Sequence, residues 1–216
     1  MDGHTLTAAP GHGHGADHHE IEIPYTVHAR PDTGVYNGKL GIWLFLASEV
    51  MLFGALFSTL ILLRTSAPVW PEGSKILNVP LATLNTFNLI ASSVTVVLAW
   101  ANLRLGNLKK AKFYLGVTLF CGFVFMGIKA VEYGSKISHD LLPSTHNFYA
   151  TYYVMTGLHG LHVIGGMVVF AYLLLTANSW YATKPDQFTN RVEVTGLYWH
   201  FVDLVWIFLF PILYLL

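Results

Sequence analysis

Five long runs of apolar residues, separated by short polar connectors, make up most of the chain after residue 37. A transmembrane helix needs about 20 consecutive and mostly apolar residues, and all five runs reach that length. The strands of a membrane β-barrel would instead form segments of about 10 residues with alternating polarity, which the chain does not show. The sequence therefore predicts an all-α integral membrane bundle. Its five transmembrane helices are expected at about 39–63, 79–103, 113–133, 148–177 and 194–216.

Residues 1–37, which precede the first span, have a very different composition. They contain six of the eleven histidines, among many Gly, Ala, Pro and Asp residues. Such a segment cannot bury enough apolar surface to form a packed core, so we expect a disordered cytoplasmic tail before a membrane domain at 38–216. A His-rich run can bind divalent metal, but a soluble polar leader is the simpler interpretation. With no apolar stretch behind a basic start, the tail is not expected to be a secretory signal peptide.

Lys and Arg residues are unevenly distributed between the connectors at the two ends of the spans. Eight lie at one end and three at the other. The eight are Arg30, Lys39, Arg104, Lys109, Lys110, Lys112, Lys184 and Arg191, and the three are Arg64, Lys75 and Lys136. Since positively charged connectors tend to stay on the cytoplasmic side, we expect the N-terminus inside and the C-terminus outside.

The overall composition agrees with a membrane protein and excludes several other classes. Charged residues make up 11% of the chain, against about 25% in soluble domains, and the mean hydropathy is +0.51. The formal net charge is zero, which provides no basic surface for nucleic acid. The single cysteine, Cys121, excludes an intrachain disulfide and any zinc or iron–sulfur site built from this chain's cysteines alone.

A small set of ionisable residues lies inside the predicted spans. They are Glu49, Lys129, Glu132, His159, His162, His200 and Asp203. Each costs a few kcal/mol to place in a membrane, so such residues usually face the interior of the bundle and mark a function or a tight internal pair.

Glu49 has no polar partner on its own helix. The residues three and four positions away are Phe45, Leu46, Leu52 and Phe53, whose side chains cannot donate a hydrogen bond. The carboxyl is therefore either protonated, because the membrane solvates its charged form poorly, or hydrogen-bonded to a partner on another helix.

The candidate partners follow from the depth of each polar residue. At a rise of 1.5 Å per residue, Glu49 and His159 lie near the middle of the membrane, and His162 and His200 lie about 10 Å from the inner face, with Asp203 between these depths. Glycines of the fourth span would allow a close helix contact there, namely Gly157, Gly160, Gly165 and Gly166. We hypothesise that Glu49 hydrogen-bonds to His159 or His162 across this contact.

Lys129 and Glu132 are expected to form a local ion pair. They lie three residues apart on the third span, close enough to meet on one face of the helix. Their position near the outer end of that span would also let the lysine reach toward the lipid headgroups. This pair therefore needs no other subunit to explain it.

The histidines also raise the question of a metal or haem site. A bis-histidine haem needs imidazoles on facing helices, and His159 or His162 together with His200 would in principle supply them. His159 and His162 are however only three residues apart, and the chain lacks the paired histidines of a two-haem bundle. Hydrogen-bonded polar packing is the preferred interpretation, and no metal ligand is assigned.

Four short motifs together resemble subunit III of the haem–copper respiratory oxidases. These are LASEVMLF at 46–53, KAVEY at 129–133, TGLHGLHV at 156–163 and YWHFVDLVWIFLF at 198–210. The resemblance covers about Gly38 to the C-terminus. It implies a five-helix form of a subunit that has seven helices in mitochondria, located in the inner (plasma) membrane of a bacterial-type cell.

The resemblance also implies an accessory role without redox chemistry. Members of this family bind no haem or copper, which are held by partner subunits. They pack beside subunit I in a complex that also contains subunit II, hold phospholipids, support proton uptake and protect the oxidase during turnover. Glu49 matches the carbodiimide-reactive acid of the family, which agrees with a protonated carboxyl. Glu132, His159, His162, His200 and Asp203 match further motif positions, as structural or proton-environment residues.

The resemblance leaves some points open. Many relatives have Gln at the position of Lys129, and the two absent helices mean that lipid contacts cannot be transferred residue by residue. The main expectation is a proton-pumping cytochrome c oxidase that reduces O₂ to water, and the alternative is a quinol oxidase. A self-sufficient membrane cytochrome using His162 and His200 is a further alternative. A small transporter built round Glu49 is another, although the chain shows no inverted repeat.

Overall fold

The computed structural model describes residues 29–31 and 33–216. Most of the tail predicted at 1–37 therefore lies outside the described residues, together with the predictions of disorder and of metal binding made for it. Within the described part the chain is helical throughout, with short connecting turns.

Six helices and a final π-helical turn follow one another along the chain. Their bounds are α1 Asn37–Ser66, α2 Gly73–Ile76, α3 Val79–Arg104, α4 Leu108–Ser138, α5 Asn147–Thr183, α6 Pro185–Phe210 and η1 Pro211–Leu215. Among the described residues five helices are long and apolar enough to cross a membrane, with α6 and η1 forming one continuous span. The all-α class and the five long helices predicted from the hydrophobic pattern are confirmed.

All four predicted connectors between the long helices are shorter than expected. The third long helix begins at Leu108 and the fifth at Pro185, so both extend beyond the apolar runs predicted at 113–133 and 194–216. Several cations counted with the connectors therefore lie in the polar ends of helices, among them Lys109, Lys110, Lys112, Lys136 and Arg191. Hydropathy marks the part of a helix that is apolar, whereas the helix itself continues for as long as the backbone hydrogen bonds can form.

The sequence explains where several of the helices begin and turn. At the start of α3 the Asn78 side chain accepts a hydrogen bond from the backbone N–H of Leu81, and a proline occupies the first turn. The α3–α4 turn contains Gly106 at φ +76°, a left-handed conformation that glycine adopts without steric cost. Pro185 opens α6 directly after α5, so these two helices form a tight hairpin.

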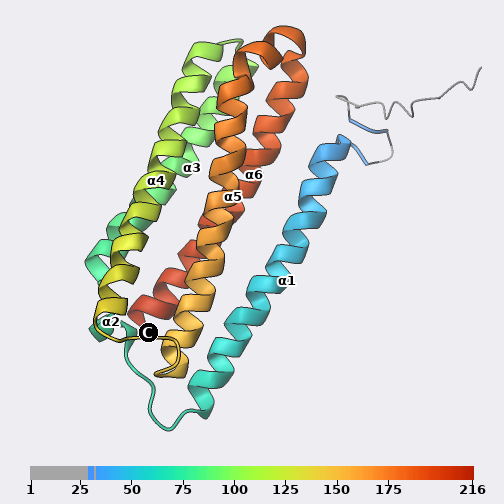
Figure 1. The fold of residues 1–216 in the computed structure, drawn as a ribbon. Helices are drawn as coiled ribbons and strands as arrows, with labels where there is room; N and C mark the ends of the chain where they lie inside the picture. Colours follow the sequence, from blue (N-terminus) through green and yellow to red (C-terminus); the bar gives the residue numbers. More distant parts are fainter. Residues whose placement is uncertain (1–28, 32) are drawn as a thin grey trace, which may run out of the picture.

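α3, α4, α5 and α6 form the main bundle, and α1 lies along one side of it (Figure 1). α3 packs mainly on α4 and α6, whereas α1 contacts α6 and α5. The core contains large aromatic residues such as Trp199 and Trp206, both completely buried. In contrast, α1 buries only one narrow stripe of residues, namely Leu46, Phe53 and Leu60. Most of the surface of α1 is thus left for lipid or for other proteins.

Among the four glycines predicted to allow close packing, Gly166 is the one that requires it. A Cβ atom added there would lie 2.7 Å from the Trp199 ring, shorter than any normal contact. An added Cβ at Gly157 or Gly160 would find its nearest neighbour at 3.8 or 3.9 Å. The close approach of α5 and α6 therefore depends mainly on Gly166.

Candidate functional site

Glu49 and His162 form a direct contact between α1 and α5. Glu49 Oε2 lies 2.8 Å from His162 Nε2, and each side chain is 15% exposed. Of the two histidines considered from the sequence, the structure thus brings only His162 to the acid. Residues three apart on a helix point about 60° apart, and His162 is the one that faces α1.

The second ring nitrogen of His162 fixes how protons are arranged in this contact. Nδ1 lies 2.8 Å from the backbone carbonyl oxygen of Leu158. A carbonyl oxygen can only accept, so Nδ1 carries a hydrogen. In a neutral imidazole Nε2 must then accept, which requires Glu49 to be a protonated acid; otherwise the imidazole is a cation and Glu49 a carboxylate. In both forms the pair is neutral overall, and a single proton lies between the two residues.

Aromatic residues surround this pair and limit how it can move. The Phe53 ring lies edge-on to His162 with 5.3 Å between the ring centres. Tyr198 donates a hydrogen bond of 2.9 Å to the His162 carbonyl, and its ring lies nearly parallel to the imidazole at 6.5 Å. The low polarity of these rings strengthens the Glu49–His162 interaction, because there is little water to compete with it.

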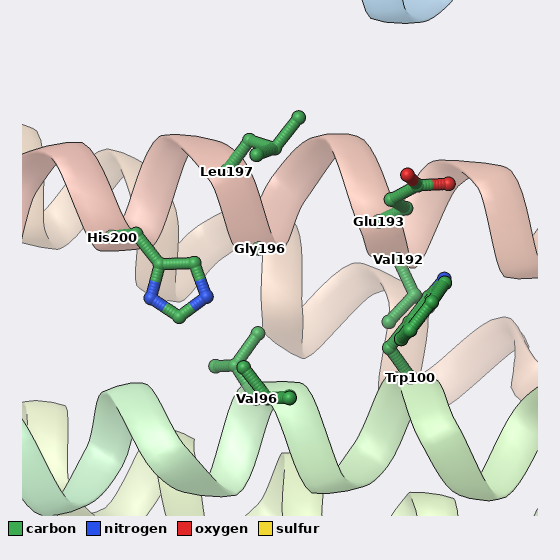
Figure 2. Close-up of a pocket in the computed structure, with 8 residues that line it drawn as sticks. Val96, Trp100, Val192, Glu193, Gly196, Leu197 and His200 are labelled. Carbon is green, nitrogen blue, oxygen red and sulfur yellow. The ribbon is translucent and has the colours of Figure 1, made fainter.

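His200 and Asp203 form a second polar group, between α6 and α3. His200 Nδ1 makes a short hydrogen bond to the Ser93 hydroxyl. Asp203 is buried one turn further along α6, and the same hydroxyl is its polar neighbour. Neither Asp203 oxygen has a hydrogen bond of normal geometry to the described residues. Figure 2 shows the His200 ring directed into the space between the two helices.

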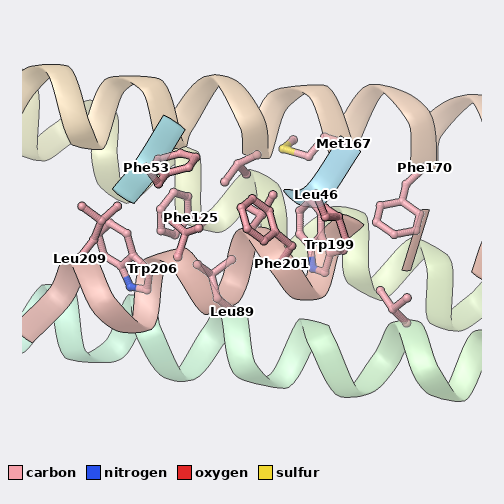
Figure 3. Packing of buried hydrophobic residues seen from close by; sticks show 14 of the residues in the cluster. Leu46, Phe53, Leu89, Phe125, Met167, Phe170, Trp199, Phe201, Trp206 and Leu209 are labelled. Atoms are coloured by element: carbon pink, nitrogen blue, oxygen red, sulfur yellow. The ribbon is translucent and has the colours of Figure 1, made fainter. Parts of the chain in front are cut away.

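His159 lies in the centre of the bundle, away from Glu49. It is 1% exposed, and its ring packs 5.6 Å from Phe125 and 5.2 Å from Trp206. Figure 3 shows Phe125 and Trp206 side by side in this core. Neither ring nitrogen of His159 has a hydrogen-bond partner among the described residues. An imidazole without partners in so apolar a setting must be neutral, because charging it there would cost too much free energy.

Lys129 and Glu132 form the predicted pair, at 2.8 Å, but the lysine does not reach toward the membrane surface. Lys129 is 6% exposed and points into the bundle, where its Nζ lies 4.6 Å from the centre of the Trp206 ring. Such cation–π contacts stabilise a desolvated ammonium group. The expectation that Lys129 approaches the headgroups is therefore wrong, because the bundle itself offers it better partners.

Two members of this ion cluster were not foreseen from the sequence. Tyr214, near the C-terminus, donates to both oxygens of Glu132 at 2.9 and 3.0 Å and accepts a short hydrogen bond from Lys129. Lys136 adds a second cation 3.6 Å from Glu132. Spacing gives a signal for Lys136, four residues after Glu132. No sequence pattern links Tyr214 to residues more than eighty positions away.

The two histidines of the haem alternative, His162 and His200, take part in separate contacts, with Glu49 and with Ser93. Both ring nitrogens of His162 are already engaged by Glu49 and by the Leu158 carbonyl, so neither is available to an iron atom. Among the described residues, no group of three or more His, Cys, Asp or Glu side chains is arranged to hold a metal ion.

The five long apolar helices in the described part of the chain and the polar residues buried between them define a multi-pass membrane protein. A family model described as "Cytochrome c oxidase subunit III" matches residues 19–216. The chain belongs to this family, subunit III of the haem–copper oxidases. It is thus a component of a multi-subunit terminal oxidase of the respiratory chain.

The curated relatives point to one branch of the family. The chain is 33% identical over 203 residues to the cytochrome bo(3) ubiquinol oxidase subunit 3 of Pseudomonas aeruginosa. The aligned region covers 94% of this chain and 95% of the relative. It is 31% identical over 192 residues to a probable quinol oxidase subunit 3 of Staphylococcus aureus, covering 88% and 94%. Both relatives carry the name of a quinol oxidase, whereas the sequence favoured cytochrome c oxidase with quinol oxidase as the alternative.

Proposed function

We propose that this chain is the accessory, non-redox subunit III of a proton-pumping quinol oxidase in a bacterial plasma membrane. Haem and copper would be bound by partner subunits, with this chain packed beside subunit I and in contact with phospholipid. Its N-terminus would face the cytoplasm, as the connector charges suggest. The quinol donor is supported by the names of two relatives that match nearly the whole chain.

The observation that carries the functional role is the neutral Glu49–His162 pair. The two residues share one proton inside the inner half of the membrane, and both remain 15% exposed at the side of the bundle. A protonated pair at this position holds a proton without a net charge, which a membrane interior tolerates far better than an isolated carboxylate. We infer that it supports proton uptake by a neighbouring subunit and has no catalytic role of its own.

Carbodiimide labelling of the assembled complex tests this role, since carbodiimides react with a carboxyl that has access to a proton. We expect the label on Glu49 in the wild-type complex, no label on this chain in Glu49→Gln, and unchanged assembly and haem content. Labelling of the Glu49→Gln chain at another acid would show that the reactive residue had been chosen wrongly.

Steady-state oxidation assays test the electron donor separately. We expect the purified complex to oxidise a quinol and not reduced cytochrome c. The opposite preference would return the assignment to cytochrome c oxidase, while the family and the role of the Glu49–His162 pair would stand.

Loss of the whole subunit should leave the initial rate but shorten the catalytic lifetime.

A further inference from the structure

A membrane-facing groove follows α6 on both sides of His200. One hollow lies between α3 and α6, and the other between α6 and α1; His200 and Leu197 line both. We call the two together the His200 groove. The remaining lining is almost wholly apolar, with Val96, Val97 and Gly196 on one side and Trp43, Ala47, Val50, Phe201 and Leu204 on the other. The hollow between α3 and α6 is shown in Figure 2.

Two polar atoms in this groove have unused hydrogen-bonding capacity. His200 uses Nδ1 for Ser93, and Nε2 makes no hydrogen bond to the described residues. Trp100 lines the same hollow, and its buried Nε1 likewise has no partner in the described part of the chain. A buried polar group without a partner costs about 1–3 kcal/mol. Trp100 Nε1 is such a buried group, whereas His200 is half-buried and its Nε2 is open to the cavity. Together they indicate that the cavity holds a molecule with hydrogen-bonding atoms.

The depth of His200 argues against a phospholipid as that molecule. Glu193, paired with Lys39 at 2.7 Å, is the last charged residue before the apolar part of α6 that contains His200. His200 lies seven residues further in, about 10 Å along the helix. A phospholipid carries its polar atoms at the surface and offers only hydrocarbon at such depth. In addition, the Glu193 carboxylate lines the hollow between α3 and α6 and would repel a phosphate.

Ser93 allows His200 to serve either as donor or as acceptor. A hydroxyl can donate to Nδ1 or accept from it, so Nε2 can carry a hydrogen or a lone pair in the neutral ring. The Asp203 carboxyl beside Ser93 provides another acceptor for the hydroxyl hydrogen. The group is thus able to bind a carbonyl oxygen in one state and a hydroxyl in the other.

We propose that the His200 groove binds the ring of a membrane quinone, with His200 Nε2 and Trp100 Nε1 as its hydrogen-bonding groups. A quinone has two carbonyl oxygens on a ring that dissolves in the hydrocarbon layer. The hollow between α3 and α6 has a volume of about 180 Å³, and cavities of roughly 150 Å³ hold a benzene ring. The apolar hollow along α1 leads away from His200 and accommodates the isoprenoid chain. This inference rests on the proposed function, because it takes the quinol donor as the ligand.

Photoaffinity labelling of the whole purified complex tests the site. The complex is placed in nanodiscs of defined phospholipid with an azido-quinone, and labelled peptides are mapped with and without excess unlabelled quinone. We expect label on peptides that contain Trp100 or His200, and we expect excess unlabelled quinone to prevent it. His200→Phe should weaken binding by up to about tenfold, the loss of one hydrogen bond. Val97→Phe should block the cavity without removing a polar group.

His139→Phe serves as the matched control, because His139 is an exposed histidine at the far end of α4. It should leave labelling unchanged. The proposal would be overturned if label persisted in both His200→Phe and Val97→Phe, or if a phospholipid displaced the label as well as a quinone does. Crosslinking of the groove to a helix of another subunit would also overturn it. If the complex oxidises quinol but the groove stays unlabelled, only this inference fails. If it oxidises cytochrome c alone, the proposed donor fails, and labelling still decides whether the site exists.

Discussion

The molecule buries ionisable side chains in two different ways. Glu49 and His162 join a loosely packed helix, α1, to the bundle through one shared proton, and both remain partly exposed. Lys129, Glu132 and Tyr214 lie deep between helices that pack closely, in a cluster with several hydrogen bonds and cation–π contacts. The first arrangement suits a group whose proton is to be exchanged. The second suits a group that holds the structure together.

The two arrangements should differ in how much they contribute to stability, because one is charged and fully buried and the other is neutral and partly exposed. Removing one member of a fully buried ion pair leaves an uncompensated charge and costs about 3–5 kcal/mol. Removing one member of a neutral, partly exposed pair leaves only a polar group that water or another subunit can reach. The ion cluster should therefore dominate stability, whereas the Glu49–His162 pair should affect proton chemistry with little change in stability.

The largest effect is expected from Glu132→Gln. The substitution removes the negative charge that Lys129 and Lys136 share, so two cations remain buried without a counterion. We expect a loss of about 3–5 kcal/mol and failure of the chain to accumulate in the purified complex. Quantifying this subunit against the haem content of the complex measures the effect.

Glu72→Gln provides the control for that substitution. Glu72 also pairs with a lysine three residues away, at 2.8 Å, but its side chain is 58% exposed. Exposed pairs contribute about 0–1 kcal/mol, so assembly should be normal. Equal losses for the two variants would show that burial does not distinguish the pairs.

A smaller effect is expected from Gly166→Ala, which lies one turn after His162 on α5. Its Cβ would overlap the Trp199 ring at 2.7 Å and push α5 away from α6. We expect a loss of about 1–3 kcal/mol, seen as a lower midpoint of thermal unfolding. Gly157→Ala should be neutral, because its nearest neighbour is the Tyr133 hydroxyl at 3.8 Å. If Gly157→Ala proved the more damaging, the assigned helix contact would be wrong.

Tyr214→Phe sharpens the comparison further by removing one hydroxyl from the ion cluster. Glu132 loses a hydrogen bond and Lys129 loses an acceptor. We expect a destabilisation of about 1–2 kcal/mol with the complex still assembled, again from thermal unfolding. Tyr172→Phe is the control, since Tyr172 is 49% exposed on the same bundle. An unchanged midpoint in Tyr214→Phe would mean that the C-terminal turn does not stabilise the cluster.

The sequence predicted most of the fold because the membrane restricts the choice so strongly. Apolar runs of sufficient length predict the long helices, although hydropathy placed the starts of α4 and α6 too late. Ends such as that of α3 depend on capping and on glycine at positive φ, which hydropathy does not detect.

The candidate site was predictable only in part. An acid without polar neighbours on its own helix pointed to a partner elsewhere, and depth narrowed the choice to His159 or His162. Which of them faces α1 depends on how α5 is rotated about its axis, and that is set by packing contacts such as the one at Gly166. Tyr214 joins Glu132 only because the chain folds back over the bundle after Pro211, a long-range arrangement without a local signal.

The most direct test of the account is the infrared carboxyl signal of Glu49 in the assembled complex, assigned by its absence in Glu49→Gln. Its partner is identified by replacing His162 and His159 in turn with Leu; His159 is the matched control, three residues away on the same helix. The account predicts that the signal shifts in His162→Leu and is unchanged in His159→Leu, with the overall stability altered by less than about 1 kcal/mol in Glu49→Gln. A signal that is insensitive to His162, or that responds only to His159, would contradict the shared proton between Glu49 and His162.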